Sequence, residues 1–233
     1  MPVLRCLSFI IFLCYLPNQA KSQGIYSDFG QNRVQYSPFH WTAYRSETAD
    51  LLYHDSQLRY AVEFADRTIT EQLPKVEKLL GYKTSNRPQF MIYGSWSDYK
   101  QNNVGYVNPQ WHSGGITFIP AEALPIYHDG NFAAFKTQIT RGICDFLIRE
   151  MIYGGTLQDR FERLKSPALP FWFTEGLSVI ISEGWGAEQE TDLRDGFATG
   201  TFDNFNLLSR DNQSLMGRSI WKFIIDQHGK DVI

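Results

Sequence analysis

Hydrophobic residues at three- and four-residue spacing predict helices in several parts of the chain. The clearest is 56–80, where apolar positions share one helical face and Gly81 follows as a stop signal. Pro74 lies inside this segment and is expected to kink or divide the helix. The same spacing predicts further helices over 131–153, 171–182, 191–196 and 214–228.

Short apolar runs between turn residues predict strands only in the first half of the chain. A strand is expected within 44–53, a buried strand at 88–93 and a third at 114–120 that pairs with 90–93. A short helix is expected over 96–104 and a loop over 120–130. Because strands and helices occur together in the first part of the chain and helices alone follow, the order predicts an α+β domain with a segregated sheet.

The N-terminus has the pattern of a secretory signal peptide. Arg5 precedes an apolar run, Cys6–Leu16, and small residues at Ala20 and Ser22 offer cleavage sites. The run is too short to span a bilayer as a helix. We therefore expect residues 1–22 to be a signal peptide and residues 23–233 to form one domain of an exported protein.

The composition of the chain argues against one class of partner and against an internal disulfide. The formal net charge is −3 and no basic block is present, so nucleic acid is not an expected partner. Removal of the signal peptide leaves Cys144 as the single cysteine, so no internal disulfide can form. Cys144 has apolar neighbours and is expected to be a buried structural thiol.

Five short motifs follow one another over most of the chain after residue 24. In this order they resemble the exported peptidase MA-like gluzincins of bacteria, which are often found ahead of a β-propeller in TolB-like envelope proteins. The resemblance implies a zincin-like (gluzincin) fold, with a small sheet followed by a helical half. The motifs are Phe29–Tyr36, Gly115–Pro120, Pro170–Ser178, Leu193–Gly196 and Gly217–Ile224.

The zinc-binding motif that this family implies is degenerate here. In an active member one helix carries His-Glu-x-x-His, and a glutamate on a later helix completes the zinc ligands. By position the histidines fall on Arg141 and Asp145, the catalytic glutamate on Gly142, and the later ligand is retained as Glu175. Arginine cannot ligate zinc and glycine cannot act as a base. The resemblance therefore implies a pseudopeptidase with no catalytic residue, no metal and no cofactor.

Two arrangements of the degenerate cluster are open from the residues. In the first, the Arg141 guanidinium stands in for zinc and bridges Asp145 and Glu175, with Arg149 as a further compensating charge. In the second, Arg141, Asp145 and Arg149 form a solvated stripe at four-residue spacing.

Other side chains near the cluster have weaker signals. Trp172 and Ser178 are possible cleft-lining residues, although core packing is the simpler interpretation of the tryptophan. Three histidines are scattered without a ligand partner at metal spacing, which is typical of surface or core residues. These are His112, His128 and His228.

The leading functional hypothesis is a non-catalytic zincin-like domain that acts as a protein-binding or scaffolding module in the bacterial cell envelope. It places the protein in the periplasm or at the outer-membrane periphery of a Gram-negative bacterium. The expected partner is another protein, and a membrane-associated assembly is compatible with this location. One alternative is a metallopeptidase in which a distant histidine joins Asp145 and Glu175. Another is a structural spacer for a downstream propeller, for which the native chain would continue beyond Ile233.

Overall fold

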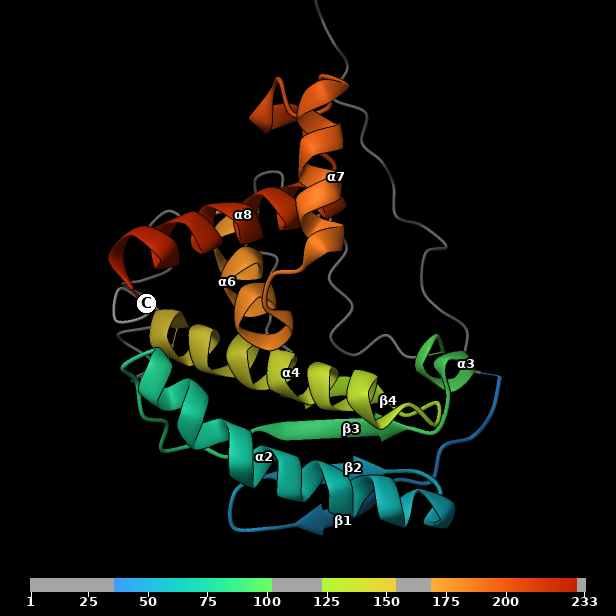
Figure 1. Cartoon of the computed structure of the whole chain (residues 1–233). Coiled ribbons are helices and arrows are strands. Elements are labelled where there is room, and N and C mark those ends of the chain that lie inside the picture. Colours follow the sequence, from blue (N-terminus) through green and yellow to red (C-terminus); the bar gives the residue numbers. More distant parts are fainter. Residues whose placement is uncertain (1–35, 102–122, 154–168, 230–233) are drawn as a thin grey trace, which may run out of the picture. The chain divides into compact units, whose positions relative to one another are not determined.

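The computed structural model describes residues 36–101, 123–153 and 169–229, which all belong to one unit that spans residues 33–233. Its architecture is α+β, with a four-stranded mixed sheet and helices both between and after the strands (Figure 1). The strands are β1 (Thr42–Arg45), β2 (Asp50–Tyr53), β3 (Gln89–Tyr93) and β4 (Ala123–Tyr127). The helices are η1 (Ser56–Leu58), α2 (Arg59–Leu79), α3 (Trp96–Tyr99), α4 (Phe132–Tyr153), α6 (Phe171–Glu183), α7 (Ala187–Ala198), η3 (Phe205–Leu207) and α8 (Arg210–His228).

The strands lie in the order β1-β2-β3-β4. β1 and β2 are antiparallel, whereas β2, β3 and β4 are parallel, with Leu51 beside Phe90 and Met91 beside Pro125. Alternate residues face opposite sides of a strand. Phe90 and Ile92 therefore enter the main core, while Met91 and Tyr93 face a smaller aromatic cluster with Phe39 and Trp41.

The main core lies between the sheet and the helices. α2 and α4 pack on each other and both contribute buried apolar residues beside the strands. α6 packs on α4, α8 packs on α6, and α7 contacts α8, so the helices extend away from the sheet (Figure 1). This order makes α4 the element that joins the sheet to the helical half.

Helix α2 confirms the prediction for 56–80, with η1 as its first turn. Its end is also as expected, because Gly81 has a φ of 60° and Tyr82 N donates to Glu77 O at 3.1 Å. Pro74 does not divide the helix, which runs through this residue, so of the two expected effects of the proline the division is wrong. The buried face of α2 continues past the proline through Val76 to Leu80, and this packing stabilises both halves.

The single strand expected within 44–53 is two strands. A turn at Ser46–Ala49 separates β1 from β2, and Ser46 closes it: its backbone N donates to Ala49 O at 3.0 Å, and its side-chain oxygen accepts from Ala49 N at 3.1 Å. The hydroxyl thus takes part in a local turn that the apolar pattern did not reveal.

The loop expected over 120–130 contains strand β4. Proline weakens the prediction of a strand because it lacks an N–H donor, and Pro125 lies at the centre of β4. Within the described part of the sheet, β4 has only β3 as a neighbour, so a missing donor on its other side is tolerated. The strand expected at 114–120 lies outside the described residues.

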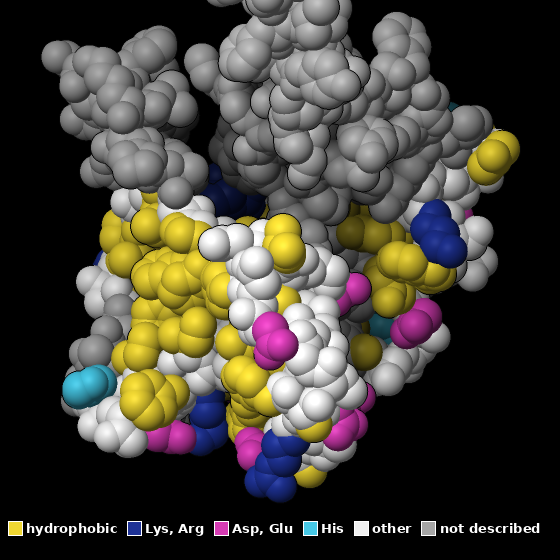
Figure 2. Space-filling view, turned by 90° about the horizontal axis from the view of Figure 1, so that it is seen from above, with side chains coloured by type: hydrophobic (Ala, Val, Ile, Leu, Met, Phe, Trp, Pro, Cys, Tyr) yellow, Lys and Arg dark blue, Asp and Glu magenta, His cyan; other side chains and the backbone are white. Residues whose placement is uncertain are grey.

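All of the other predicted helices are present, but some of them differ in length from the prediction. α4, α6 and α8 are present where expected, whereas α3 is shorter than 96–104 and α7 is longer than 191–196. On α8 the tryptophan Trp221 is buried, whereas Phe223 is 63% exposed. Figure 2 shows hydrophobic side chains (yellow) gathered on the left of the visible face, which is the side where Figure 1 shows α8.

Two glycines let α6 and α8 cross with their backbones in contact. A Cβ on Gly176 would lie 2.3 Å from the carbonyl carbon of Gly217, and one on Gly217 would lie 2.0 Å from Trp172 O. Beside this crossing, Trp221 Nε1 donates to Phe173 O at 2.8 Å and Arg218 Nε donates to Gly184 O at 2.6 Å. No larger residue fits at the crossing without separating the helices.

We expect Gly217→Ala to destabilise the protein, although alanine favours helix more than glycine by about 1 kcal/mol. Overlap of the new Cβ with the Trp172 carbonyl should cost about 3 kcal/mol, the upper end for overpacking, because the oxygen belongs to the backbone of α6 and cannot move alone. Urea denaturation measures the change, with Gln227→Ala on the exposed face of α8 as the control. An unchanged midpoint for Gly217→Ala would contradict the close crossing.

His128 is a buried histidine without a hydrogen-bond partner for either ring nitrogen among the described residues. Its ring is surrounded by Phe132, Phe135 and Tyr60, with centroid distances of 4.5, 5.0 and 5.5 Å. Burial lowers the pKa of His128, and the charge of Asp129 offsets only part of this effect. The neutral imidazole is thus the form that fits the folded protein.

A lowered folded-state pKa gives a definite pH dependence. The contribution of His128 to stability is fully present above its unfolded pKa of about 6.5 and is lost as pH falls below that value. We expect the melting temperature to fall more between about pH 7.5 and pH 5 in the wild type than in His128→Leu. His228→Leu, at the exposed end of α8, should follow the wild type. Parallel curves for the wild type and His128→Leu would contradict this prediction.

Candidate functional site

Helices α4 and α6 bring together Arg141 and Glu175, two residues of the cluster predicted from sequence. The Nη2 of Arg141 forms an ion pair and hydrogen bond with Oε1 of Glu175. Glu175 Oε1 also accepts from the Ser214 hydroxyl of α8 at 3.5 Å. The side chain of Glu175 is 17% exposed, so this carboxylate is largely removed from water and needs its cationic partner.

The second carboxylate that forms an ion pair with Arg141 is that of Glu183. Glu183 Oε1 lies 3.9 Å from Arg141 Nη1, and its other oxygen lies 3.1 Å from Nη1 of Arg218. The Arg218 side chain is 8% exposed. Two guanidiniums and two carboxylates, Arg141, Arg218, Glu175 and Glu183, therefore form one continuous ion network across α4, α6 and α8.

The sequence analysis missed Glu183, Arg218 and Ser214. Glu183 lies two helical turns after Glu175 on α6, a spacing that keeps it close to the same face. Arg218 lies beside Gly217 in one of the motifs that resemble the gluzincins. Neither residue had a pairing partner that could be identified before the packing of α8 on α6 was known.

Charges and burial act in opposite directions on the pKa of Arg141. Burial lowers it, but the charges of Glu175, Asp145 and Glu183 and the hydrogen bond to Glu175 outweigh burial and raise it above its ordinary value. Arg141 thus stays charged. For Arg218 burial prevails, and its pKa is lowered despite the charge of Glu183.

Asp145 lies one turn further along α4, close enough for its charge to raise the pKa of Arg141, although the described side chains show no ion pair between the two. Burial raises the pKa of its carboxyl, while a hydrogen bond with Ser178 and the charge of Arg141 lower it in part. Arg149, the expected compensating charge, donates from Nε to the backbone carbonyl of Asp145 at 3.1 Å. Of the bridge expected from Arg141 to Glu175 and Asp145, the structure has the ion pair with Glu175, and the other ion pair of Arg141 in the described residues is with Glu183.

Gly142 faces the sheet and not the cluster. A Cβ at this position would lie 2.6 Å from Cε1 of Phe90 on β3. The absence of a side chain thus allows α4 to pack closely on the sheet. A glutamate here would meet the Phe90 ring in the buried core.

The two possible cleft residues lie elsewhere. Ser178 is fully buried between α6 and α4, where its hydroxyl donates to Arg141 O at 3.5 Å. Trp172 packs edge-on against Phe173 and Phe205. Cys144 is fully buried, and burial raises the pKa of its thiol.

A cavity of about 670 Å³ opens beside the ion network. α6 contributes residues at four-residue spacing, so a single face of this helix forms one wall, while α7 and the start of α8 form the others. Neither Trp172 nor Ser178 lines this cavity. The charged lining residues include Arg141, Glu175 and Glu183 of the ion network, together with Asp192, Asp195 and Asp211 from α7 and α8.

Comparisons of the chain with protein families, curated proteins and solved structures find no match. Within the described ranges, no three or more histidine, cysteine, aspartate or glutamate side chains are grouped as a metal site requires. The same ranges contain no helix with both the length and the hydropathy needed to cross a bilayer. Residues 1–22 and His112 lie outside the described residues.

The coupling between Arg141 and Glu175 can be measured by a double-mutant cycle with Arg141→Met and Glu175→Gln. Each single variant leaves a charge beside the cavity without its partner, so the double variant should lose less stability than the two singles together. We expect a coupling of about 1–2 kcal/mol in urea denaturation, as for close, partly buried pairs.

The exposed pair Arg59–Glu63 on α2 is a matched control. Its Nε–Oε1 distance is 3.0 Å, and both side chains are more than half exposed. Exposed pairs at four-residue spacing contribute about 0.3–0.5 kcal/mol. A coupling at Arg141–Glu175 that is no larger than this value would show that the pair does not hold α4 and α6 together.

Proposed function

We propose that this chain is a non-catalytic, zincin-like domain of an exported bacterial protein, a pseudopeptidase that acts as a protein-binding or scaffolding module in the cell envelope. The α+β order of the elements is compatible with such a fold. The motifs that resemble peptidase MA-like gluzincins and the N-terminal pattern of a signal peptide support export to the periplasm or the outer-membrane periphery.

The observation that carries the proposal is the contact between Arg141 and Glu175. In an active gluzincin the residues at these two matched positions bind the same zinc ion. Their contact here supports the alignment of α4 and α6 with the two zinc-binding helices. It also supports a replacement of the zinc ion by the Arg141 guanidinium, whose positive charge neutralises Glu175 without a bound metal.

The donor set does not fit zinc. Arg141 carries a permanent positive charge beside Glu175, and arginine has no lone pair to give to a metal. Among the described residues no imidazole joins Asp145 and Glu175, and carboxylates alone make a weak zinc site. Gly142 supplies no general base, and Phe90 fills the space that one would need.

A protein-binding role is supported by the cavity beside the ion network. The fold brings one face each of α6, α7 and α8 to this cavity, and the ion pairs fix its base. A scaffold that retains a peptidase-like groove after the metal is lost can still bind a polypeptide, although fold alone does not establish function.

We expect the purified mature protein to contain far less than stoichiometric zinc and to leave unfolded casein intact. The double variant Arg141→His with Asp145→His should gain one Zn²⁺ or Co²⁺ site, since two histidines four residues apart then join Glu175. Titration with Co²⁺ and visible absorption would detect the site. Adding Glu175→Ala to the double variant is the control and should abolish it.

Two results would count against the proposal. Stoichiometric zinc in the wild type together with casein cleavage would favour a metallopeptidase with unconventional ligands. Failure of the folded double variant to bind Co²⁺ would mean that the matched positions do not converge as they do in gluzincins.

A further inference from the structure

The side chain of His128 is a buried polar group just after β4. It is 2% exposed, and neither ring nitrogen has a hydrogen-bond partner among the described residues. A neutral imidazole has one donor and one acceptor, whereas an imidazolium has two donors and a positive charge. Aromatic faces attract a cation, but by less than the cost of desolvating a charge that has no partner. Packing alone therefore holds this ring, and protonation opposes that packing.

The neighbours of the ring come from the first turns of two helices. Tyr60 is the second residue of α2 and Phe132 is the first residue of α4, and both rings contact that of His128. They are 52% and 41% exposed, and neither belongs to the main core. Phe135 lies beneath them and is fully buried, and Phe64 packs on Phe132. The pocket thus has an outer wall of two rings that can move outward while the core stays filled.

The backbone around His128 is held by hydrogen bonds that do not involve its ring. His128 N donates to Tyr93 O at 2.9 Å. Gln138 of α4 forms two hydrogen bonds of 3.1 Å with the backbone of Tyr127, one through each side-chain atom. The imidazole can therefore leave its pocket while β4 remains in the sheet and attached to α4.

Asp129 is the charged group next to His128 in the chain. Its side chain is exposed, and its Oδ1 accepts a hydrogen bond from Asn131 N at 3.3 Å. Burial lowers the pKa of His128, and the charge of Asp129 offsets only part of this effect. This acid therefore does not stabilise an imidazolium in the pocket.

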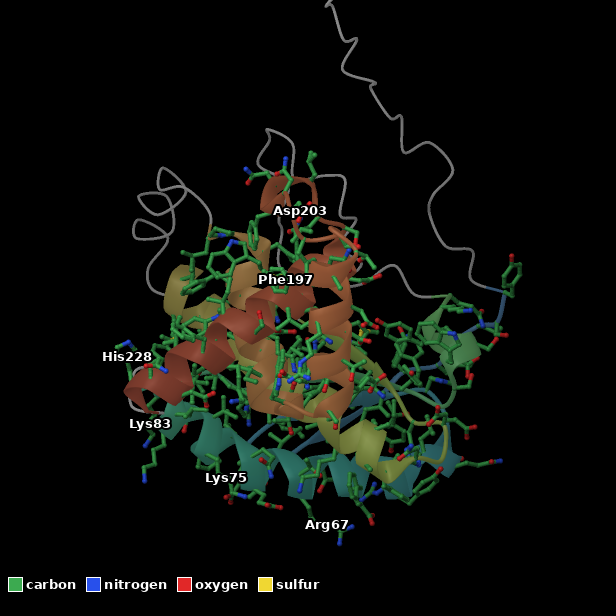
Figure 3. All side chains as sticks on the ribbon, turned by 45° about the horizontal axis from the view of Figure 1, so that its top comes forward. Arg67, Lys75, Lys83, Phe197, Asp203 and His228 are labelled. Carbon is green, nitrogen blue, oxygen red and sulfur yellow. The ribbon has the colours of Figure 1, made fainter. Side chains whose placement is uncertain are left out.

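The charged side chains of the two helices are engaged elsewhere or lie in solvent. On α2, Arg59 pairs with Glu63, and Arg67 is exposed and extends away from the helix (Figure 3). On α4, Lys136 is exposed. Tyr60 contributes a phenol, which is uncharged at neutral and acid pH. None of these described side chains pairs with an imidazolium at position 128.

The same tripeptide, Tyr-His-Asp, occurs at the ends of β2 and β4, at positions 53–55 and 127–129. The two histidines have different surroundings. His54 Nε2 lies 4.0 Å from Asp98 Oδ2, so an imidazolium at position 54 has a carboxylate beside it. Within the described residues His128 forms no such pair, so of the two histidines it is the one whose protonation the fold opposes.

We propose that His128 is an acid-sensitive switch that controls the contact between the first turns of α2 and α4. Above about pH 6.5 the neutral ring fills its pocket. As pH falls below this value, protonation moves the ring into solvent, Tyr60 and Phe132 separate, and Phe64 and Phe135 become accessible. The switch goes beyond the proposed function and does not rest on it, because His128 takes no part in the ion network.

Hydrogen–deuterium exchange of the purified protein at about pH 7.5 and about pH 5 tests the switch, with rates corrected for the pH dependence of exchange itself. Peptides from 56–66 and 123–135 should lose protection about fivefold or more at the lower pH, whereas peptides from α8 should not. Unchanged protection would overturn the proposal. An equal loss in α8 would also overturn it, because it would show a global loss of stability in place of a local opening.

His128→Leu removes the titrating group and keeps an apolar side chain in the pocket. It should show no loss of protection at low pH in the same two regions. His228→Leu is the control, since His228 lies at the exposed end of α8, and it should behave as the wild type (Figure 3). The same loss in His128→Leu as in the wild type would overturn the proposal. If His128→Leu does not fold, His128→Phe makes the same test with a ring in the pocket.

Binding of the apolar dye anilinonaphthalene sulfonate gives a second readout. Its fluorescence should rise reversibly in the wild type with a midpoint below about pH 6.5, while the far-ultraviolet circular dichroism stays constant. His128→Leu should bind less dye at the same pH. An equal rise in both proteins would show that another group opens the structure and would overturn the assignment to His128.

Discussion

Helix α4 has to bury two opposite faces, and this constraint determines the chemistry of the whole molecule. On one side it packs on the sheet through Ile139, Ile143 and Leu147, which are fully buried. On the other side it packs on α6, where Arg141 and Asp145 are partly removed from water. Charged groups in such a position must be paired or neutralised, because desolvation of an isolated charge costs far more than packing returns.

The pairing in turn determines how the helical half is assembled. Glu175 and Glu183 of α6 balance Arg141 of α4 and Arg218 of α8, so three helices are joined by one neutral network. The glycine crossing brings α8 close enough to α6 for Arg218 to reach Glu183 and the Gly184 carbonyl. Close packing and charge balance thus depend on each other where α6 and α8 cross. Asp192 and Asp195 of α7 line the neighbouring cavity.

Periodicity predicted the long helices well because their buried faces are continuous. α2 and α4 have apolar residues at almost every core position, and capping residues such as Gly81 and Asn131 mark their limits. The shorter elements were harder to predict. Ser46 accepts a hydrogen bond inside a turn and so divides one apparent strand into two. Pro125 lacks the N–H that a strand residue normally donates, so its presence argued against β4. Apolar spacing reports neither effect.

The candidate site was predictable in part for a similar reason. Arg141 and Glu175 follow from the motif positions on two helices, and the contact between them follows if those helices pack. Glu183 and Arg218 could not be assigned, because their roles depend on α8, whose approach to α6 is set by Gly176 and Gly217.

Gly142 and Phe90 impose a constraint on how this sequence can change over time. A side chain at position 142 overlaps the Phe90 ring, whereas a small residue at position 90 alone leaves a cavity in the core. Each single change therefore destabilises the core, whereas a larger residue at position 142 together with a smaller one at position 90 keeps it filled. Two positions far apart in the chain are thus coupled through packing between α4 and β3.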